Sequence, residues 1–172
     1  MHTRRSALLL VGAAVLTVNA PAAVSQRTLA LPADKAILTI SGKISVTNRP
    51  GQAVFDRAML EQLGMIGFET TTPWYSTKVK FEGVPMRALL QAVGAAGQSL
   101  SVTALNDYKT VIPIEDFEKY NAILAIKRDN QYMPISDKGP LFIVYPFDAH
   151  AELKNQKFYS RSAWQVAKIE IN

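Results

Sequence analysis

The sequence has 172 residues, of which 48% are hydrophobic and 19% are charged. This is the length of one domain and the composition of a globular protein with a buried core, which excludes a disordered or fibrous chain. The net charge is +5 at pH 7, but Lys and Arg are scattered along the chain and do not support nucleic-acid binding. There is no cysteine, so the chain forms no disulfide and offers no thiolate to a metal.

The N-terminus has the plan of a secretory signal peptide. Two arginines precede an apolar run at residues 7–18, and small residues follow in the segment NAPAAVSQ. We predict that residues 1–25 are a signal peptide cleaved after Ala22 or Ser25, and that residues 26–172 form one exported, periplasmic domain. An uncleaved anchor is the alternative, although the apolar run is short for a bilayer. The paired arginines leave Sec and twin-arginine export both open.

The first half of the domain reads as a strand and a helix. Residues 36–46 alternate apolar and polar side chains, which predicts a strand that bends at Gly42. Residues 54–63 have helical periodicity, and Gly64 stands where a C-cap glycine is expected.

A loop with the sequence TTTPWY comes next and leads into a short alternating strand at residues 78–81. Pro85 suits the first turn of a second helix. The apolar residues of that helix recur at helical spacing, at Met86, Leu89, Leu90 and Val93.

The second half reads mainly as short strands. Turn signals at Asn106-Asp107 and at Asp129-Asn130 indicate two hairpins. The expected strands are 99–105, 108–114, 122–128, 131–135, 141–146 and 163–171, with a short helical turn at 115–120. Many short strands with two modest helices predict an α+β fold whose sheet is largely mixed or antiparallel.

The residues give no support to catalysis. There is no G-x-S-x-G motif and no glycine-rich phosphate loop, and the mature chain holds one histidine, His150. In an extended segment Asp148, His150 and Glu152 would project from one face, as an oxygen and nitrogen set that some metals accept. A solvated polar loop is the other interpretation, and we favour it.

Aromatic residues at the ends of elements are the stronger signal. For each of them, packing at the edge of the core is the alternative. Rings gathered on loops together with amide, carboxylate and guanidinium groups describe a small-ligand pocket. The aromatic residues concerned are Trp74, Tyr75, Tyr108, Tyr145, Phe147, Tyr159 and Trp164.

A family resemblance extends over residues 36–171. The series TTTPW, FEGVPMRALL, ALNDYKTVIPIEDF, AILAIKRDNQYMPISDKGPLFIVYP and SRSAWQVAKIEI resembles the molybdopterin-binding oxidoreductase domain of the sulfite oxidase superfamily. The resemblance implies the sulfite-oxidase-type fold, a mixed β-sheet with a few short helices. In the enzymes a cysteine binds molybdenum about a dozen residues before the glycine that matches Gly83. That position is Thr71 here, and a neutral hydroxyl cannot replace a soft thiolate.

The chain also looks similar to small periplasmic members of this fold that lack the cysteine. Those members bind reduced pterins and act on membrane-bound cyclic-di-GMP regulators. The resemblance therefore implies a non-catalytic pterin-binding protein with a reduced pterin as its ligand and no molybdenum. Two alternatives remain, namely a molybdopterin-dependent oxidoreductase or a subunit of one, and a structural domain with a vestigial pocket.

The predicted ligand-binding residues lie on the loops of one rim of the sheet. Trp74 is expected to stack on the pterin, and Asp107 or Asp148 is expected to accept hydrogen bonds from its amino edge. Arg161 is expected to hydrogen-bond the ligand, and strand alternation turns Trp164 away from the main core. The full set is Thr71, Thr72, Trp74, Tyr75, Asn106, Asp107, Tyr108, Tyr145, Asp148, Arg161 and Trp164.

Overall fold

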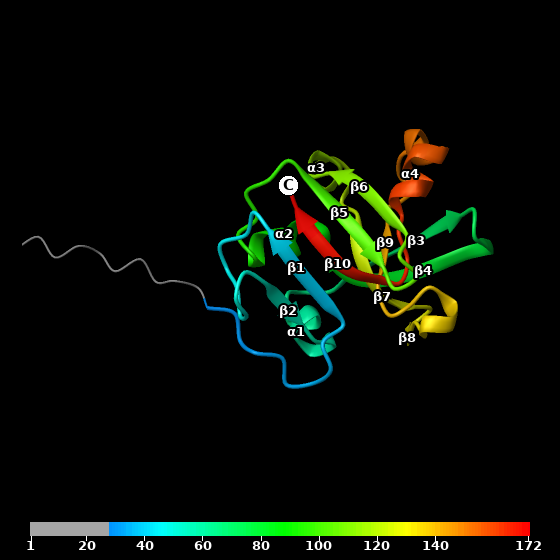
Figure 1. Ribbon diagram of the computed structural model, residues 1–172. Helices are drawn as coiled ribbons and strands as arrows, with labels where there is room; N and C mark the ends of the chain where they lie inside the picture. Colours follow the sequence, from blue (N-terminus) through cyan, green and yellow to red (C-terminus); the bar gives the residue numbers. More distant parts are fainter. Residues whose placement is uncertain (1–27) are drawn as a thin grey trace, which may run out of the picture.

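The structure is a computed structural model that describes residues 28–172, and the predicted signal peptide lies outside these residues. Within the described range the chain forms ten strands, four α-helices and two short 3-10 helices (Figure 1). This is the mixed α+β architecture expected from the sequence, with the strands divided between two sheets.

The first sheet is mixed, with the strand order β2-β1-β10-β5-β6. Strands β1 and β10 are parallel, whereas the other neighbours are antiparallel. Its strands are β1 (Leu38–Gly42), β2 (Ala53–Phe55), β5 (Ser99–Ala104), β6 (Lys109–Pro113) and β10 (Val166–Ile171).

The second sheet is antiparallel, with the order β3-β4-β7-β8 and with β9 also paired to β7. Strands β3 and β4 form a long hairpin whose far end projects from the body of the domain (Figure 1). The strands are β3 (Ile66–Thr72), β4 (Tyr75–Pro85), β7 (Ile123–Arg128), β8 (Gln131–Tyr132) and β9 (Phe142–Val144).

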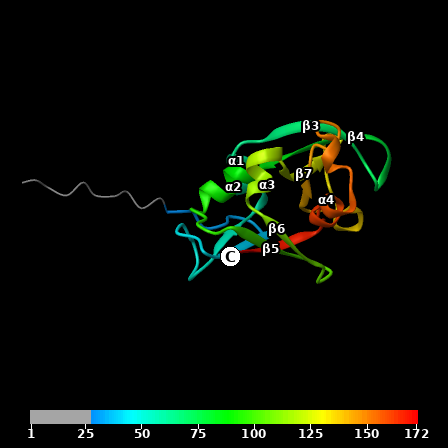
Figure 2. The same cartoon turned by 90° about the horizontal axis from the view of Figure 1, so that it is seen from above.

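The helices are short and unevenly placed. Helices α1, α2 and α3 lie on one side of the first sheet, whereas α4 lies near the free end of the β3–β4 hairpin (Figure 2). No helix among residues 28–172 is long and apolar enough to cross a membrane. The helices are α1 (Arg57–Gln62), α2 (Met86–Ala92), α3 (Glu115–Tyr120) and α4 (Gln156–Arg161), and the 3-10 helices are Ile135–Asp137 and Ala151–Leu153.

The first predicted helix begins later than expected. Residues 54–63 were expected to be helical throughout, but the first two belong to β2 and the helix begins at Arg57. Asp56 stops the strand and caps the helix, because its carboxylate accepts a hydrogen bond from the Met59 backbone N–H at 2.9 Å. Gly64 follows the helix at a φ of 98°, which confirms it as the C-cap glycine.

The expected loop TTTPWY is instead the end of the β3–β4 hairpin. Residues 66–72 form β3, Pro73 and Trp74 make the turn, and Tyr75 already belongs to β4. Strand β3 was not predicted from the sequence because this edge strand is largely exposed and has no clear apolar alternation.

The second predicted helix is confirmed, and all four of its predicted apolar residues are buried. The turn at Asn106-Asp107 joins β5 to β6, and the turn at 129–130 joins β7 to β8, both as predicted. Helix α4 was not predicted, and Arg161, expected on a loop, is its last residue.

Two hydrophobic clusters form the core. The main cluster joins the inner face of the first sheet to helices α1, α2 and α3 and includes Phe158 of α4. The smaller cluster lies on the second sheet around Phe81 and Phe142. Trp74 packs against both clusters, and the functional site lies where they meet.

Candidate functional site

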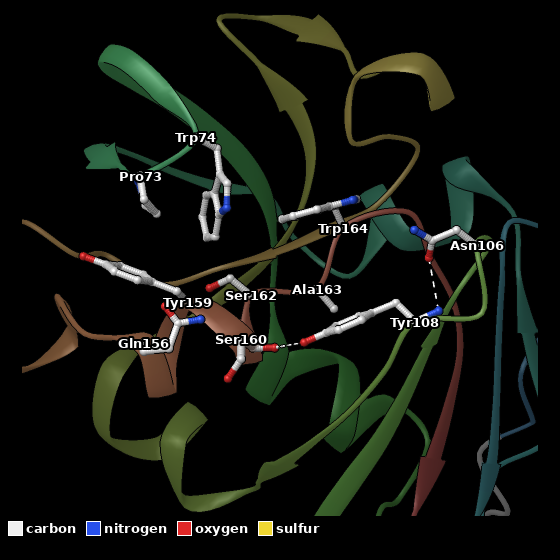
Figure 3. A pocket seen from close by; sticks show the side chains of 10 residues that line it. All are labelled: Pro73, Trp74, Asn106, Tyr108, Gln156, Tyr159, Ser160, Ser162, Ala163 and Trp164. Carbon is white, nitrogen blue, oxygen red and sulfur yellow. Dashed lines mark hydrogen bonds between the residues drawn. The ribbon is translucent and has the colours of Figure 1, made fainter.

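A pocket of about 330 Å³ lies between the β3–β4 turn, the β5–β6 turn and α4 (Figure 3). Its wall is rich in rings, and its lining contains no Asp, Glu, Lys, Arg or His. The aromatic lining residues are Trp74, Tyr108, Tyr159 and Trp164. The others are Pro73, Asn106, Gln156, Ser160, Ser162 and Ala163.

Trp74 is both a packing residue and a pocket wall. Its ring meets those of Phe142, Phe147, Tyr159 and Trp164 edge to face, at centroid distances of 5.5–6.1 Å. Packing at the edge of the core, the alternative for each of these aromatic residues, is therefore present at Trp74, because the hairpin turn folds the indole back onto both clusters. Its remaining surface faces the pocket.

Trp164 reaches the pocket because the strand alternation breaks at the start of β10. Gln165 has a positive φ of 53°, and the register with β5 shifts immediately after Val166. Val166 is consequently buried, whereas simple alternation grouped it with Trp164 on the outer face. Trp164 bridges to Phe142 and packs against the smaller cluster rather than the main one.

Polar groups at the pocket come mainly from amides and hydroxyls. The Tyr108 hydroxyl donates to the Ser160 carbonyl at 2.8 Å and so ties the β5–β6 turn to α4. The Asn106 side-chain oxygen accepts from the Tyr108 backbone N–H at 3.1 Å. Asn106 and Gln156 each carry an amide, which both donates and accepts hydrogen bonds. The pocket can therefore read a mixed donor and acceptor edge beside a flat ring.

Asp148 holds the end of β3 and does not line the pocket. Its carboxylate accepts from the Thr71 backbone N–H at 2.9 Å and from the Thr71 hydroxyl at 2.6 Å, and its own N–H donates to the Thr70 hydroxyl oxygen. Lys154 and Lys78 pair with it at 2.8 Å and 3.3 Å. Hydrogen bonds from Lys154 and Thr71 hold the pKa of Asp148 well below its ordinary value.

We expect Asp148→Asn to destabilise the domain by about 1 kcal/mol at neutral pH, because the ion pairs are partly exposed and screened by solvent. The pKa of Asp148 in the folded state lies below its unfolded value near 3.8. The extra free energy of unfolding of the wild type over Asp148→Asn is therefore fully present above pH 3.8 and is lost as the pH falls through the folded-state pKa. Urea denaturation of both proteins at neutral and acid pH measures this difference in stability, and Glu118→Gln on α3 serves as the control. A stability difference that stays constant into acid would contradict this prediction.

Tyr75 follows Trp74 directly but does not line the pocket. Its hydroxyl oxygen accepts from Arg128 at 2.9 Å, and Asp137 pairs with the same guanidinium. The Lys138 ammonium lies 5.1 Å from the ring centroids of both Tyr75 and Trp164. Tyr75 therefore belongs to a cluster of charged side chains and aromatic rings that also contains Arg128, Asp137, Lys138 and Trp164.

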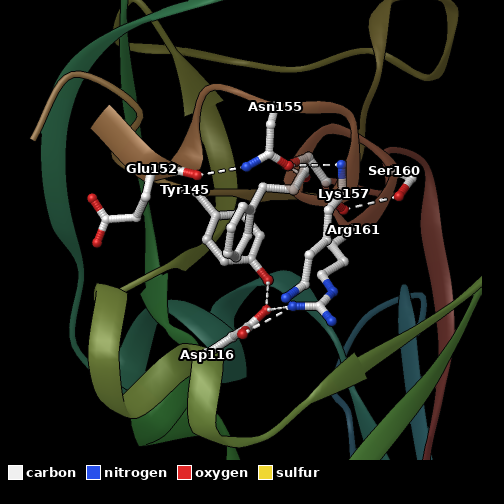
Figure 4. Close-up of polar contacts among 9 residues, drawn as sticks. Asp116, Tyr145, Glu152, Asn155, Lys157, Ser160 and Arg161 are labelled. Carbon is white, nitrogen blue, oxygen red and sulfur yellow. Dashed lines mark hydrogen bonds and ion pairs between the residues drawn. The ribbon is translucent and has the colours of Figure 1, made fainter. Parts of the chain in front are cut away.

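Tyr145 and Arg161 share one partner inside the protein, the carboxylate of Asp116 (Figure 4), and neither residue lines the pocket. The Tyr145 hydroxyl donates to Asp116 at 2.9 Å, and Arg161 Nη1 donates to both oxygens of the same carboxylate at 3.0 and 2.7 Å. Burial and the neighbouring carboxylate raise the pKa of Tyr145 far above its ordinary range, so the hydroxyl remains protonated and donates.

The structure brings four of the predicted residues together at the pocket, namely Trp74, Asn106, Tyr108 and Trp164. Seven lie elsewhere, and their contact with a ligand stays a prediction: Thr71, Thr72, Tyr75, Asp107, Tyr145, Asp148 and Arg161. Thr72 supports the hairpin turn by accepting from the Trp74 N–H at 3.3 Å, and Asp107 occupies a left-handed turn position.

Sequence reasoning missed Gln156 and Ser160 and did not commit to Tyr159, because it assigned no helix there. One signal was available. Asn155 is a favourable N-cap residue, and its side chain accepts from the Lys157 N–H at 2.9 Å. An N-cap at this point would have placed Gln156, Tyr159 and Ser160 on one helix face.

The model of the oxidoreductase molybdopterin-binding domain family matches residues 52–153, which is more than half of the chain. The chain belongs to this family. No curated protein matches it. The matched segment of this molybdopterin-binding domain includes Trp74, Asn106 and Tyr108, whereas α4 and Trp164 lie beyond it.

The pocket of this molybdopterin-binding domain suits the pterin part of the family's cofactor better than its metal. Thr71, at the position implied for the metal-binding cysteine, is exposed on β3 and donates its hydroxyl to Asp148. The chain has no cysteine to supply a thiolate. The rings and amides that line the pocket are complementary to a flat heterocycle with donors and acceptors at its edge.

The acidic and histidine side chains after β9 point to different partners. Asp148 binds β3, the His150 ring packs edge-on against Tyr120 at 5.3 Å, and Glu152 pairs with Lys119 at 3.8 Å. Among residues 28–172, no three His, Asp or Glu side chains gather as a metal-binding group. This segment is therefore an anchoring loop.

Proposed function

We propose that this molybdopterin-binding domain is a non-catalytic protein that binds a reduced pterin. The observation that carries the proposal is a neutral, ring-lined pocket of about 330 Å³ in a chain of this family that has no cysteine. A reduced pterin is planar over its pyrimidine ring, carries no net charge on its bicyclic system and is bordered by donors and acceptors. Stacking on an indole contributes on the order of 1–3 kcal/mol, by analogy with base–aromatic contacts.

Side-chain amides hydrogen-bond the polar edge of the pterin. Asp148, one of the two carboxylates considered for this role, is engaged by Thr71 and two lysines. Asn106 and Gln156 line the pocket and supply both donors and acceptors. A ring that lacks the amino and oxo edge would leave the Asn106 amide N–H groups and the Gln156 amide without these partners, and we propose this difference as the basis of selectivity.

We further propose that the exported domain works in the periplasm, where the pterin-loaded form acts on a membrane-bound cyclic-di-GMP regulator. The signal-peptide pattern of residues 1–25 and the similarity to small periplasmic members support this proposal. The pocket lies between three separate elements, so a ligand there touches the hairpin turn, the β5–β6 turn and α4 together. Binding can therefore alter the surface that these elements present to a partner.

Protein purified anaerobically from cofactor-producing cells is expected to carry a pterin and little molybdenum. Native mass spectrometry with pterin fluorescence measures the first quantity, and elemental analysis measures the second. A Trp164→Ala variant purified in parallel is the control and should carry less pterin. Near-stoichiometric molybdenum would instead support the alternative, a molybdopterin-dependent oxidoreductase or a subunit of one. Failure of every pterin to bind would leave a structural domain with a vestigial pocket.

A further inference from the structure

Helix α4 forms one wall of the pocket but is too short to hold its own position. Six residues are far fewer than an isolated helix needs in water, so tertiary contacts must fix it. The helix has two distinct faces. Gln156, Tyr159 and Ser160 line the pocket, whereas Phe158 and Arg161, three residues apart, point to the opposite side.

The opposite face is anchored first by Phe158. This ring is buried and meets Tyr120 of α3 at 5.3 Å and Tyr145 at 5.4 Å. Such aromatic contacts hold the helix close to α3 but leave it free to slide or rotate slightly, because apolar packing has little directionality. On the pocket side the Tyr108 hydroxyl already holds the Ser160 carbonyl of the helix, and a directional contact on the opposite face is also needed to fix its register.

Arg161 supplies that directional contact through Asp116 (Figure 4). Only 15% of the Arg161 side chain and 6% of the Asp116 side chain are exposed, so the pair is shielded from water. Tyr145, fully buried beyond the end of β9, donates to the same carboxylate. The carboxylate therefore joins α3, α4 and the chain after β9 at one point, with charge-assisted hydrogen bonds.

We propose that Asp116, Arg161 and Tyr145 are positioning residues for the ligand pocket. They hold α4 so that Tyr159 and Gln156 stand in place before a ligand arrives, which removes the cost of ordering that wall on binding. The inference rests on the proposed function for the identity of the ligand. It differs from the sequence-based expectation for Arg161, because the guanidinium is directed away from the pocket and acts through Asp116.

Hydrogen exchange of the ligand-free protein tests the mechanical part of the proposal. Tyr145→Phe and Arg161→Lys should each speed exchange of the backbone amides of residues 156–161 by about tenfold, while amides of β7 and β10 keep their wild-type rates. A uniform increase over the whole domain, or none in α4, would overturn the proposal. This measurement needs no ligand, so its outcome is independent of whether the protein binds a pterin.

Affinity for tetrahydrobiopterin, measured anaerobically, tests the link to binding. Asp116→Asn and Arg161→Met should each weaken binding by about tenfold, and the double variant should be no weaker than the poorer single variant, because both changes break one contact. Arg161→Lys should recover part of the loss. If Arg161 instead contacts the ligand, Asp116→Asn would leave the affinity for tetrahydrobiopterin unchanged or make it tighter, and that result would overturn the proposal. The proposal would also be overturned if the affinity losses of the two single variants added up in the double variant.

A single substitution at Asp116 or Arg161 leaves the charge of the other residue buried without its partner, which can by itself prevent folding. The double variant Asp116→Leu with Arg161→Met removes both charges together and is therefore expected to fold. It should show the same tenfold loss of tetrahydrobiopterin affinity and the same fast exchange in α4. Wild-type affinity in this folded variant would overturn the proposal. If the wild type itself binds no pterin, the proposed function fails while the exchange result stands.

Discussion

Replacing Gly83 by alanine should destabilise the domain by roughly 3 kcal/mol, at the upper end of the usual cost of overpacking. Gly83 lies in β4 directly against the backbone of β7, at a point where the register between the two strands shifts. A Cβ atom there would lie 2.5 Å from the Ala125 Cα and 2.6 Å from the Leu124 carbonyl carbon. Backbone atoms cannot move aside as a flexible side chain can, so the two strands would have to separate.

Gly64→Ala is the matched control for this substitution. Gly64 has a φ of 98°, which strains an alanine, but no atom lies within 4 Å of the position of its Cβ. We expect it to cost about 1 kcal/mol from backbone strain alone. Urea denaturation of the three proteins measures the difference. If Gly83→Ala costs no more than Gly64→Ala, the close approach of β4 to β7 does not limit stability.

The position of Gly83 also bears on the site. Strand β4 runs from the hairpin turn, where Trp74 lines the pocket, to its base against β7. A glycine at the base lets the hairpin dock closely against β7, its neighbour in the same sheet. Loss of this docking should therefore loosen the Trp74 wall as well as the core.

Trp74→Ala should lower the affinity for tetrahydrobiopterin about ten- to a hundredfold, through loss of a stacking surface. Because the indole also contacts four other rings, the substitution should cost about 2 kcal/mol of stability. Both effects come from one ring, so the binding loss must be separated from the packing loss. Anaerobic titration with tetrahydrobiopterin and urea denaturation together measure them.

Two further variants separate the effects. Val102→Ala removes buried atoms of β5 away from the pocket lining and should cost about 2 kcal/mol of stability with wild-type affinity. Trp74→Phe keeps a ring for packing and stacking and should lose less affinity than Trp74→Ala. Equal affinities for the wild type and Trp74→Ala would mean that the indole serves packing alone.

The sequence predicts best those elements whose signals are local. Helix α2 follows from Pro85 and from four apolar residues at helical spacing, because each such signal involves neighbours within two turns. The turn at Asn106-Asp107 is equally local, since it depends on residues that tolerate a left-handed backbone. The sequence did not predict β3 because it is an exposed edge strand, and it did not predict α4 because this helix is only six residues long.

Contacts between distant segments decided the roles of the individual site residues. Arg161 and Asp148 were both reasonable ligand contacts by residue type. In the structure each is engaged by a partner far along the chain, Asp116 for the first and Thr71 for the second, and contact with a ligand stays a prediction. No pattern within a few residues of Arg161 or Asp148 indicates these partners, because the pairing depends on how α3 meets α4 and how the chain after β9 meets β3.

The sequence by itself determined the lack of a thiolate ligand, the α+β class and the ring-bearing turns, because composition and short-range patterns carry that information. The tertiary structure alone decided that Trp74, Tyr108, Tyr159 and Trp164 share one pocket. These rings come from the β3–β4 turn, the β5–β6 turn, α4 and the segment between α4 and β10. Their convergence depends on long-range strand pairing and on a register shift, which no local periodicity encodes.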